Sequence, residues 1–376
     1  MTDNPLLFTP GPLSTSIMTK NAMLRDWGSR DTEFIALTRE IACTLEEIVG
    51  VDQNEPTHEC VLIQGSGTFV VEATIDTLIP ADAKTLVLIN GAYGRRMAKI
   101  CEIQKRSQVV LETDENTPVS GYQVAEFLKR DKSITHVLAV HCETTSGILN
   151  PIVEIAEAVS KAGCLLIIDA MSSFGALALN VNQLKCAAIV ASSNKCLEGV
   201  PGVGFSIIDK TILSNSQKNA TSLSLDLFDQ WQYFKKTGQW RFTPPTHVLA
   251  ALGQALKEHD AEGGVEGRCY RYRENCETLI QGMKALGFKP YLRTKLQAPI
   301  IVTFLQPNIE GFDFVEFYNG LLSRGFMIYP GKLTKVETFR IGCIGQIKKN
   351  DMKNLVEAVS DVLLNMGINL NNPELL

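Results

Sequence analysis

The chain has 376 residues and a formal net charge of −5, and 45% of its residues are hydrophobic and 20% charged. This composition is ordinary for a globular protein, and the length suits one large domain with a smaller partner. The acidic balance argues against a nucleic-acid partner, which would call for a basic patch. No apolar run approaches the roughly 18 residues of a membrane span.

The first sixteen residues, MTDNPLLFTPGPLSTS, have neither the basic segment nor the apolar core of a secretory signal. None of the ten cysteines forms a Cys-x-x-Cys pair, and most lie in apolar segments, where a free thiol behaves as a small hydrophobe. We therefore expect a reduced, cytoplasmic protein without a membrane partner. The five histidines are scattered and lack zinc-ligand spacing, so no metal site is expected.

Short apolar runs alternate with amphipathic segments through the middle of the chain. The runs predict strands buried on both faces, as in a mostly parallel sheet covered by helices. The segments 68–79, 94–105 and 151–162 predict helices, the last with Asn150 as its N-cap and Pro151 at its first position. This alternation indicates βαβ units of an α/β domain. The runs are 60–64, 85–90, 108–111, 136–140, 164–169, 187–192 and 203–208.

The character of the sequence changes after residues 262–267. Residues 209–240 are polar, and a helix is predicted near 244–256. A smaller α+β domain is then predicted, from a long charged helix onward. Its elements are the helix 268–287, a strand at 299–305, the helix 311–325, short strands at 326–330 and 337–342, and a final helix from Lys349. We place the domains at 1–15 (N-terminal segment), 16–262 (large) and 263–376 (small).

A glycine-rich turn, Gly65-Ser66-Gly67, joins the predicted strand that ends at Gln64 to a helix beginning near Thr68. A helix N-terminus offers free N–H groups and a positive dipole end, and glycine lets the backbone approach an anion closely. The turn is therefore a candidate phosphate site, and the hydroxyls of Ser66 and Thr68 could donate further hydrogen bonds to the phosphate. The alternative is a plain strand-to-helix turn with Ser and Thr as caps.

Asp169 ends a predicted buried strand, and Lys195 follows the next predicted strand along the chain. The carboxyl ends of strands in an open α/β sheet face the ligand crevice, so both side chains are expected at one edge. Asp169 would pair with a cationic ligand nitrogen or metal, or would cap the Ser-rich turn that follows it. Lys195, with its pKa lowered by burial, would be a nucleophile or Schiff-base former. The alternative for Lys195 is a lysine that extends to the surface.

Arg340 lies in the short apolar strand 337–342 of the predicted small domain. An arginine there could bind a carboxylate or phosphonate with two parallel hydrogen bonds. The alternative is an edge-strand arginine in an ion pair.

The order of these features resembles the class V aminotransferases, which use pyridoxal 5′-phosphate (PLP) and have the aspartate-aminotransferase (type I) fold. Among them the chain is most similar to the 2-aminoethylphosphonate–pyruvate transaminases, over nearly its whole length. The resemblance implies a large domain with a mostly parallel seven-stranded sheet and an α+β C-terminal domain. It rests on LLFTPGPLSTS, RDWGSRDTEF, QGSGTFVVEA, NGAYGRRM, HCETTSGILNP, DAMSSFGA, SSNKCLEGVPGVGF and FRIGCIG.

The resemblance also implies roles for individual residues. Lys195 would form the Schiff base with PLP and move the proton, and Asp169 would pair with the pyridinium nitrogen. Arg340 would bind the anionic end of the substrate, and residues 1–15, with Gly11 and Pro12, would lie along the substrate pocket. The remaining cofactor contacts would be Ser66, Gly67 and Thr68 at the phosphate, Tyr93 and Met171 on the two ring faces, Thr145 near O3′, and Thr243 from the second subunit of a homodimer with shared active sites.

The implied reaction moves the amino group of 2-aminoethylphosphonate to pyruvate, giving phosphonoacetaldehyde and L-alanine in phosphonate degradation. Because FRIG and GSGT also suit alanine–glyoxylate or serine–pyruvate transaminases, that activity stays open as an alternative. The block RDWGSRDTEF separates the two better, and Arg25 or Arg30 in it is a candidate for attracting the phosphonate. A helix entry with surface ion pairs explains these two arginines equally well.

Overall fold

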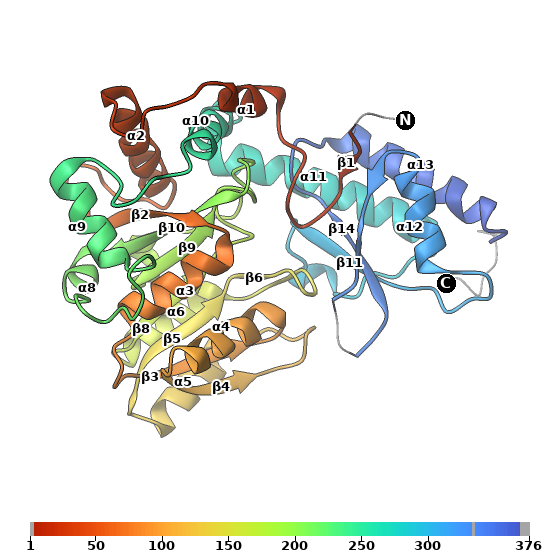
Figure 1. The fold of residues 1–376 in the computed structure, drawn as a ribbon. Coiled ribbons are helices and arrows are strands. Elements are labelled where there is room, and N and C mark those ends of the chain that lie inside the picture. The colour runs from red at the N-terminus through yellow and green to blue at the C-terminus, as the bar shows by residue number, and fades with distance from the viewer. Residues whose placement is uncertain (1–3, 333–334, 369–376) are drawn as a thin grey trace.

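The computed structural model describes residues 4–332 and 335–368. Its centre is a seven-stranded sheet in the order β2-β10-β9-β8-β5-β3-β4 (Figure 1). Strand β10 runs antiparallel to both of its neighbours, and the other adjacent pairs are parallel. The seven predicted runs are these seven strands, so the predicted mostly parallel sheet is confirmed. They are β2 (His58–Gly65), β3 (Lys84–Ile89), β4 (Ser107–Glu112), β5 (Ile134–Val140), β8 (Leu165–Asp169), β9 (Ala188–Ser192) and β10 (Gly202–Asp209).

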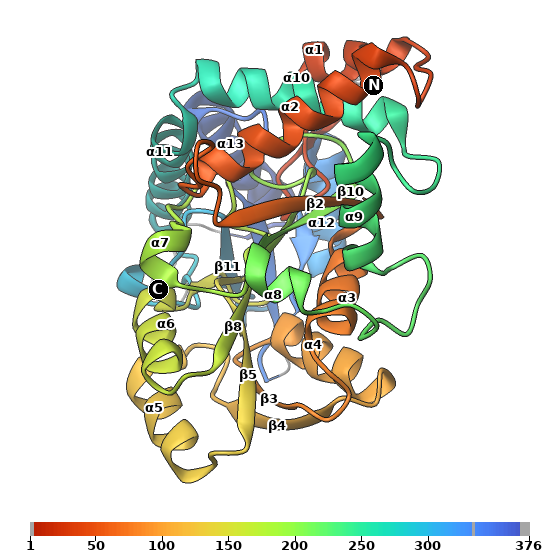
Figure 2. The ribbon, with the colours of Figure 1, turned by 90° about the vertical axis from the view of Figure 1, so that its left-hand side faces the viewer.

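Helices cover both faces of this sheet, and a separate apolar core fills each side. In Figure 2, α5 and α6 lie on one side of the strands and α3 and α4 on the other. Helices α2 and α10 pack against each other beside β2. The helices of this part are α1 (Ile17–Asn21), η1 (Ala22–Leu24), α2 (Thr32–Ile48), α3 (Gly67–Leu78), α4 (Ala92–Ile103), α5 (Gly121–Arg130), α6 (Ile152–Lys161), α7 (Val181–Leu184), α8 (Lys210–Ser214), α9 (Leu227–Thr237) and α10 (Thr246–Ala261).

The predicted start of α6 was wrong by one residue. Pro151 is the N-cap and the helix begins at Ile152. The Asn150 side chain does not cap the helix, because it joins two strand ends instead. Its amide nitrogen donates to the carbonyl oxygen of Val140 at 2.9 Å, and its oxygen accepts from the amide of Asn90 at 2.8 Å.

The C-terminal part has its own three-stranded antiparallel sheet, β11-β14-β13, and its own core. The core is rich in phenylalanine, and Phe339 of β14 lies with its ring centre 5.4–6.1 Å from four other phenylalanine rings. The elements are α11 (Gly264–Ala285), η2 (Thr294–Leu296), β11 (Ile301–Leu305), α12 (Phe314–Leu322), β12 (Phe326–Met327), β13 (Tyr329–Pro330), β14 (Thr338–Gly342) and α13 (Lys349–Asn365).

The N-terminal segment belongs spatially to this C-terminal part. Strand β1 (Leu6–Leu7) lies beside the C-terminal elements in Figure 1. It pairs in parallel with β12, and Phe8 is fully buried in the phenylalanine-rich core. In the large part of the chain, a short antiparallel hairpin of β6 (Cys142–Glu143) and β7 (Ile148–Leu149) follows β5. Within the described ranges, 4–332 and 335–368, no helix has the length and apolarity needed to cross a membrane.

A buried ionic cluster ties the loop after β9 to α11. Glu198 has only 3% of its surface exposed, and its carboxylate accepts from Arg271 at 2.8 Å, from the Tyr272 hydroxyl at 2.5 Å and from Gln346 at 2.8 Å. Arg268 lies 3.6 Å away. Glu198 also has a left-handed backbone φ of 60°, which is uncommon for a residue with a side chain. These contacts hold the loop that carries Lys195.

We expect Glu198→Ala to lower the free energy of unfolding by about 3–5 kcal/mol, because the substitution removes a buried carboxylate of this cluster and leaves Arg268 and Arg271 to share Glu262. Urea unfolding followed by circular dichroism measures this. The matched control is Glu274→Ala, which breaks a partly exposed pair with Lys349 at 3.0 Å and is expected to cost less than about 1 kcal/mol. Equal losses in the two variants would contradict the role given to the Glu198 cluster.

Candidate active site

A cavity of about 170 Å³ lies where β8, β9 and the N-terminus of α3 meet. Because β8 and β9 are parallel neighbours, their carboxyl ends bring Asp169 and the Lys195 loop to one edge of the sheet. The structure therefore places most of the predicted cofactor residues around one space. The lining residues are Ser66, Gly67, Thr68, Val71, Tyr93, Arg96, Met97, Asp169, Met171, Ser192, Asn194 and Lys195.

The glycine-rich turn forms one end of this cavity. Ser66 is the N-cap residue of α3, but its side chain makes no capping hydrogen bond. Gly67 packs so closely on the Met171 thioether that a Cβ atom would collide with it. Arg96 donates to the Thr68 hydroxyl at 2.9 Å and so brings a positive charge to the turn. Helix dipole, hydroxyls and guanidinium together suit a phosphate group.

Lys195 points inward and does not extend to the surface. Its Nζ donates to the carbonyl oxygen of Pro10 at 2.5 Å. Gly11 lies against the same side chain, and a Cβ atom at Gly11 would collide with it. Burial lowers the pKa of Lys195, and the positive charge of Arg340 lowers it further. A larger share of this amine is therefore neutral near pH 7 than for a lysine in water, as a nucleophile or base requires.

Asp169 is a buried ionisable group of the cavity. Only 6% of its surface is exposed, and Oδ1 accepts the Met171 backbone N–H at 2.9 Å. The carboxylate therefore caps the turn that follows it, as the alternative prediction for Asp169 stated. It also lines the cavity. Burial raises the pKa of Asp169 to about 6, since the Met171 hydrogen bond and the charges of Arg96 and Lys195 offset only part of the desolvation.

Glu143 does not line the cavity but contacts the segments beside it, and no motif in the sequence pointed to it. The side chain is fully buried, and its carboxylate accepts four hydrogen bonds. Oε2 accepts the backbone N–H groups of Tyr93 and Gly94 at 3.1 and 3.2 Å. Oε1 accepts the backbone N–H and the hydroxyl of Thr145 at 3.2 and 2.5 Å. Glu143 thereby fixes the first turn of α4, and with it Tyr93, relative to Thr145.

Arg340 reaches the site from the C-terminal sheet. Its Nε donates to the Pro330 carbonyl at 3.1 Å and its Nη1 to the Thr144 carbonyl at 3.1 Å. These bonds hold the guanidinium beside the β6–β7 hairpin, and its remaining N–H groups are available for an anion. No carboxylate partner of Arg340 is found among the residues that the structure describes, so the ion-pair alternative is not supported there.

Seven predicted site residues do not line the cavity. Three of them contact residues around it, namely Gly11, Thr145 and Arg340, and the other four are exposed in this single chain. Pro12 is exposed, although its carbonyl accepts from the Thr9 hydroxyl beside Gly11. Arg25 pairs with Glu33 at the start of α2 and stacks on Trp27, in agreement with the alternative prediction of a surface ion pair at a helix entry. A role for Arg25 in substrate binding stays a prediction.

Arg30 and Thr243 are also exposed, Arg30 before α2 and Thr243 before α10. Neither lines the cavity. The expectation for Thr243 concerned a second subunit, so both roles stay predictions.

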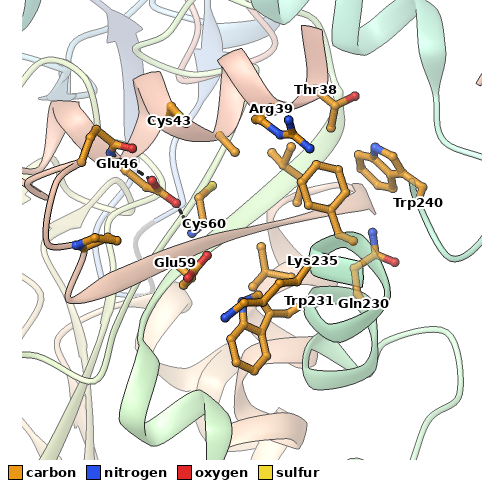
Figure 3. A pocket seen from close by; sticks show the side chains of 16 residues that line it. Thr38, Arg39, Cys43, Glu46, Glu59, Cys60, Gln230, Trp231, Lys235 and Trp240 are labelled. Carbon is orange, nitrogen blue, oxygen red and sulfur yellow. Dashed lines mark hydrogen bonds between the residues drawn. The ribbon is translucent and has the colours of Figure 1, made fainter. Parts of the chain in front are cut away.

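A second cavity of about 280 Å³ lies between α2, β2 and α9 (Figure 3). Its buried carboxylate, Glu46, is already occupied, because it accepts from the Cys60 backbone N–H at 2.7 Å and from the Gln53 amide at 3.1 Å. Burial raises the pKa of both Glu46 and the Cys60 thiol, which disfavours a reactive thiolate. None of the predicted site residues lines this space. We therefore place the candidate active site in the smaller cavity, which Asp169 and Lys195 line.

Fold and site together define an α/β protein with an inward-pointing, half-buried lysine and a buried aspartate at the carboxyl ends of neighbouring strands, beside a helix N-terminus suited to a phosphate. Comparison with known proteins agrees with this class. The family model described as aminotransferase class V matches residues 19–331. The chain belongs to the class V aminotransferase family, and it is an aminotransferase of the predicted type I fold.

Relatives of similar length agree over nearly the whole chain. The chain is 51% identical over 368 residues to the 2-aminoethylphosphonate–pyruvate transaminase of Pseudomonas putida (strain GB-1), covering 98% of this chain and 99% of that one. It is 52% identical to 2-aminoethylphosphonate–pyruvate transaminase 1 of Cupriavidus pinatubonensis, covering 98% and 97%. The solved ureidoglycine–glyoxylate aminotransferase of Bacillus subtilis has the same fold, with a TM-score of 0.89, 22% identity and coverage of 100% and 97%.

The raised pKa of Asp169 predicts how the stability of the cofactor-free protein depends on pH. Between about pH 4 and 6 the folded protein keeps a carboxyl proton that the unfolded chain has lost, so stability falls as the pH rises through this range. Asp169→Asn removes this loss. At pH 7 we expect the variant to be more stable than the parent by about 2–3 kcal/mol, and at pH 4 we expect no difference.

Urea unfolding of the cofactor-free proteins at pH 4, 5, 6 and 7 measures the effect. Asp52→Asn is the control, because Asp52 makes the same hydrogen bond to a backbone N–H two residues on, with Asn54 at 2.9 Å, but is exposed. A stability difference for Asp169→Asn that does not change with pH would contradict the assignment.

Proposed function

We propose that this aminotransferase uses PLP to move the amino group of 2-aminoethylphosphonate to pyruvate, giving phosphonoacetaldehyde and L-alanine. The observation that supports this type of reaction is that Lys195, Asp169 and the Ser66–Thr68 turn line the same small cavity. The substrate is supported by the 51–52% identity to relatives that carry this name, over nearly the full length of both chains.

The donors around the cavity fit PLP by their chemistry. Ser66, Gly67 and Thr68 would hold the phosphate at the helix N-terminus. The Asp169 carboxylate would pair with the ring nitrogen, and a cationic partner there would lower the raised pKa of Asp169 again. Met171 would lie on one face of the ring. When bound, PLP supplies the electron sink that lets a carbon next to nitrogen lose its proton.

The chain itself must hold and move that proton. Lys195 is suited to this because burial lowers its pKa toward the working pH, which favours both uptake and release of a proton. Tyr93 and Thr145, held in place by Glu143, would border the ring and its O3′ side. Gly11 and Pro10, which pack on Lys195, would limit the access of water to the amine.

We further propose a homodimer in which Thr243 of the partner subunit completes the phosphate site. Large apolar side chains are exposed close to the residues concerned. Phe242, next to Thr243, is 46% exposed, and Phe69, next to Thr68, is 53% exposed. Aromatic side chains are enriched at protein–protein interfaces, so an exposed phenylalanine beside each of these residues fits such an interface. The ten cysteines are free in the structure, which supports a reduced, cytoplasmic location.

The purified enzyme with PLP should form alanine from pyruvate when 2-aminoethylphosphonate is the donor. We expect Lys195→Ala to lower kcat by about 10²–10⁴-fold, since it removes the general base. Lys210→Ala, a partly exposed lysine paired with Glu59, is the control and should leave kcat unchanged. Alanine formation from other amino donors but none from 2-aminoethylphosphonate would overturn the proposed substrate, and the alanine–glyoxylate type of activity would then be favoured.

The proposed dimer predicts that Phe242→Glu shifts the protein toward the monomer, because a charge would be buried in an apolar interface. Sedimentation velocity at several protein concentrations measures the shift. Tyr122→Glu is the control, since Tyr122 is 76% exposed on α5 and lies outside the expected interface. A dimer as stable as that of the parent would count against Phe242 as an interface residue.

A further inference from the structure

The proposed substrate requires more positive charge than Arg340 alone provides. A phosphoryl group carries about −1.5 to −2 charges at pH 7 on three acceptor oxygens, and a phosphonate offers the same three oxygens. A carboxylate carries one charge on two oxygens. Arg340 has five N–H donors, and two of its nitrogens already donate to the Pro330 and Thr144 carbonyls. A second cation near this end of the site would therefore favour a phosphonate over a carboxylate.

Lys332 is such a cation. Its Nζ lies 4.4 Å from the ring centre of Tyr93, which lines the cavity. Burial by itself would raise the pKa of the Tyr93 hydroxyl, but Lys332, Thr144 and Lys195 together outweigh it and the pKa is lowered. Arg340 also interacts electrostatically with Tyr93. The positive charges of Lys332, Arg340 and Lys195 therefore all interact with the Tyr93 side chain at the cavity.

The backbone around Lys332 is fixed from the β14 side. Gly331 donates its N–H to the Thr338 carbonyl at 2.8 Å, and it passes so close that a Cβ atom would collide with Thr338. Tyr329, two residues earlier, is paired in register with Arg340. Lys332 therefore leaves the same small sheet that carries Arg340, and it does so directly after an anchored glycine.

The neighbouring Lys335 differs from Lys332 because its charge is already neutralised by a carboxylate. Lys335 is exposed and pairs with Asp114 at 2.5 Å. Lys332 is half-buried, and no carboxylate lies within 4.0 Å of its amine among the residues that the structure describes. Its contact with the Tyr93 ring is a weak cation–π interaction, which leaves its charge available to a ligand.

We propose that Lys332 determines specificity by supplying, with Arg340, the second positive charge for a phosphonate, and that it contributes much less to the binding of a carboxylate. This inference rests on the proposed function. A hydrogen bond to a charged group contributes about 1.5–3 kcal/mol, which corresponds to roughly 10–100-fold in affinity. Lys332 is assigned no role in proton transfer.

The test uses the PLP-loaded enzyme and variants Lys332→Met, Lys332→Arg and Lys335→Met. Binding of ethylphosphonate and of propionate, two unreactive anions, is measured by calorimetric titration. For Lys332→Met we expect the dissociation constant of ethylphosphonate to rise about 10-fold or more and that of propionate to rise less than about 3-fold. Lys332→Arg should restore most of the phosphonate affinity, and Lys335→Met should change neither constant.

Turnover separates this inference from the proposed function. In Lys332→Met, KM for 2-aminoethylphosphonate should rise about 10-fold while KM for pyruvate stays within about 3-fold. Equal changes for both anions, or no change, would overturn the role of Lys332 even if the parent enzyme uses 2-aminoethylphosphonate well. A parent enzyme that does not use this donor would overturn the proposed function instead, and the titration would still decide whether Lys332 discriminates phosphonate from carboxylate.

Discussion

The burial of two ionisable groups, Asp169 and Lys195, is the constraint on which the site depends. In the described chain no ion pair joins the two side chains directly, and burial shifts their pKa values in opposite directions, up for the carboxyl and down for the amine. Both shifts favour the neutral forms, so the folded chain loses stability by placing these groups at the ends of β8 and β9. Such a cost is expected where a ligand later provides the missing partners.

The surrounding architecture holds these groups in place. The loop after Lys195 is fixed by Glu198, whose partners come from α11 and from the segment after β14. The other wall is fixed by Glu143, which joins the start of α4 to the β6–β7 hairpin. The N-terminal segment, anchored by Phe8 in the C-terminal core, brings the Pro10 carbonyl to the amine. Three distant segments of the chain are needed to position one lysine.

The sequence predicted the sheet well because its strands are buried on both faces, and such strands appear as short uninterrupted apolar runs. It could not give the antiparallel direction of β10, the pairing of β1 with β12 or the true partners of Asn150, since these depend on contacts between distant residues. Asp169 and Lys195 were recognisable because Asp169 ends such a run and Lys195 follows the next one. Glu143 and Lys332 were not, because their importance lies in what they contact in the folded chain.

The charge around the site is of opposite sign to that of the whole molecule. The chain carries a net charge of −5, yet Arg96, Lys195, Lys332 and Arg340 gather around a cavity whose acidic neighbours are Asp169 and Glu143. A local excess of positive charge in a small, partly desolvated space attracts anions and is relieved by binding them. A cofactor phosphate at the α3 end and an anionic substrate at the Arg340 end would supply that relief at separate places. Two such places would let one anion stay bound while the other is exchanged, as the proposed reaction with two successive substrates would require.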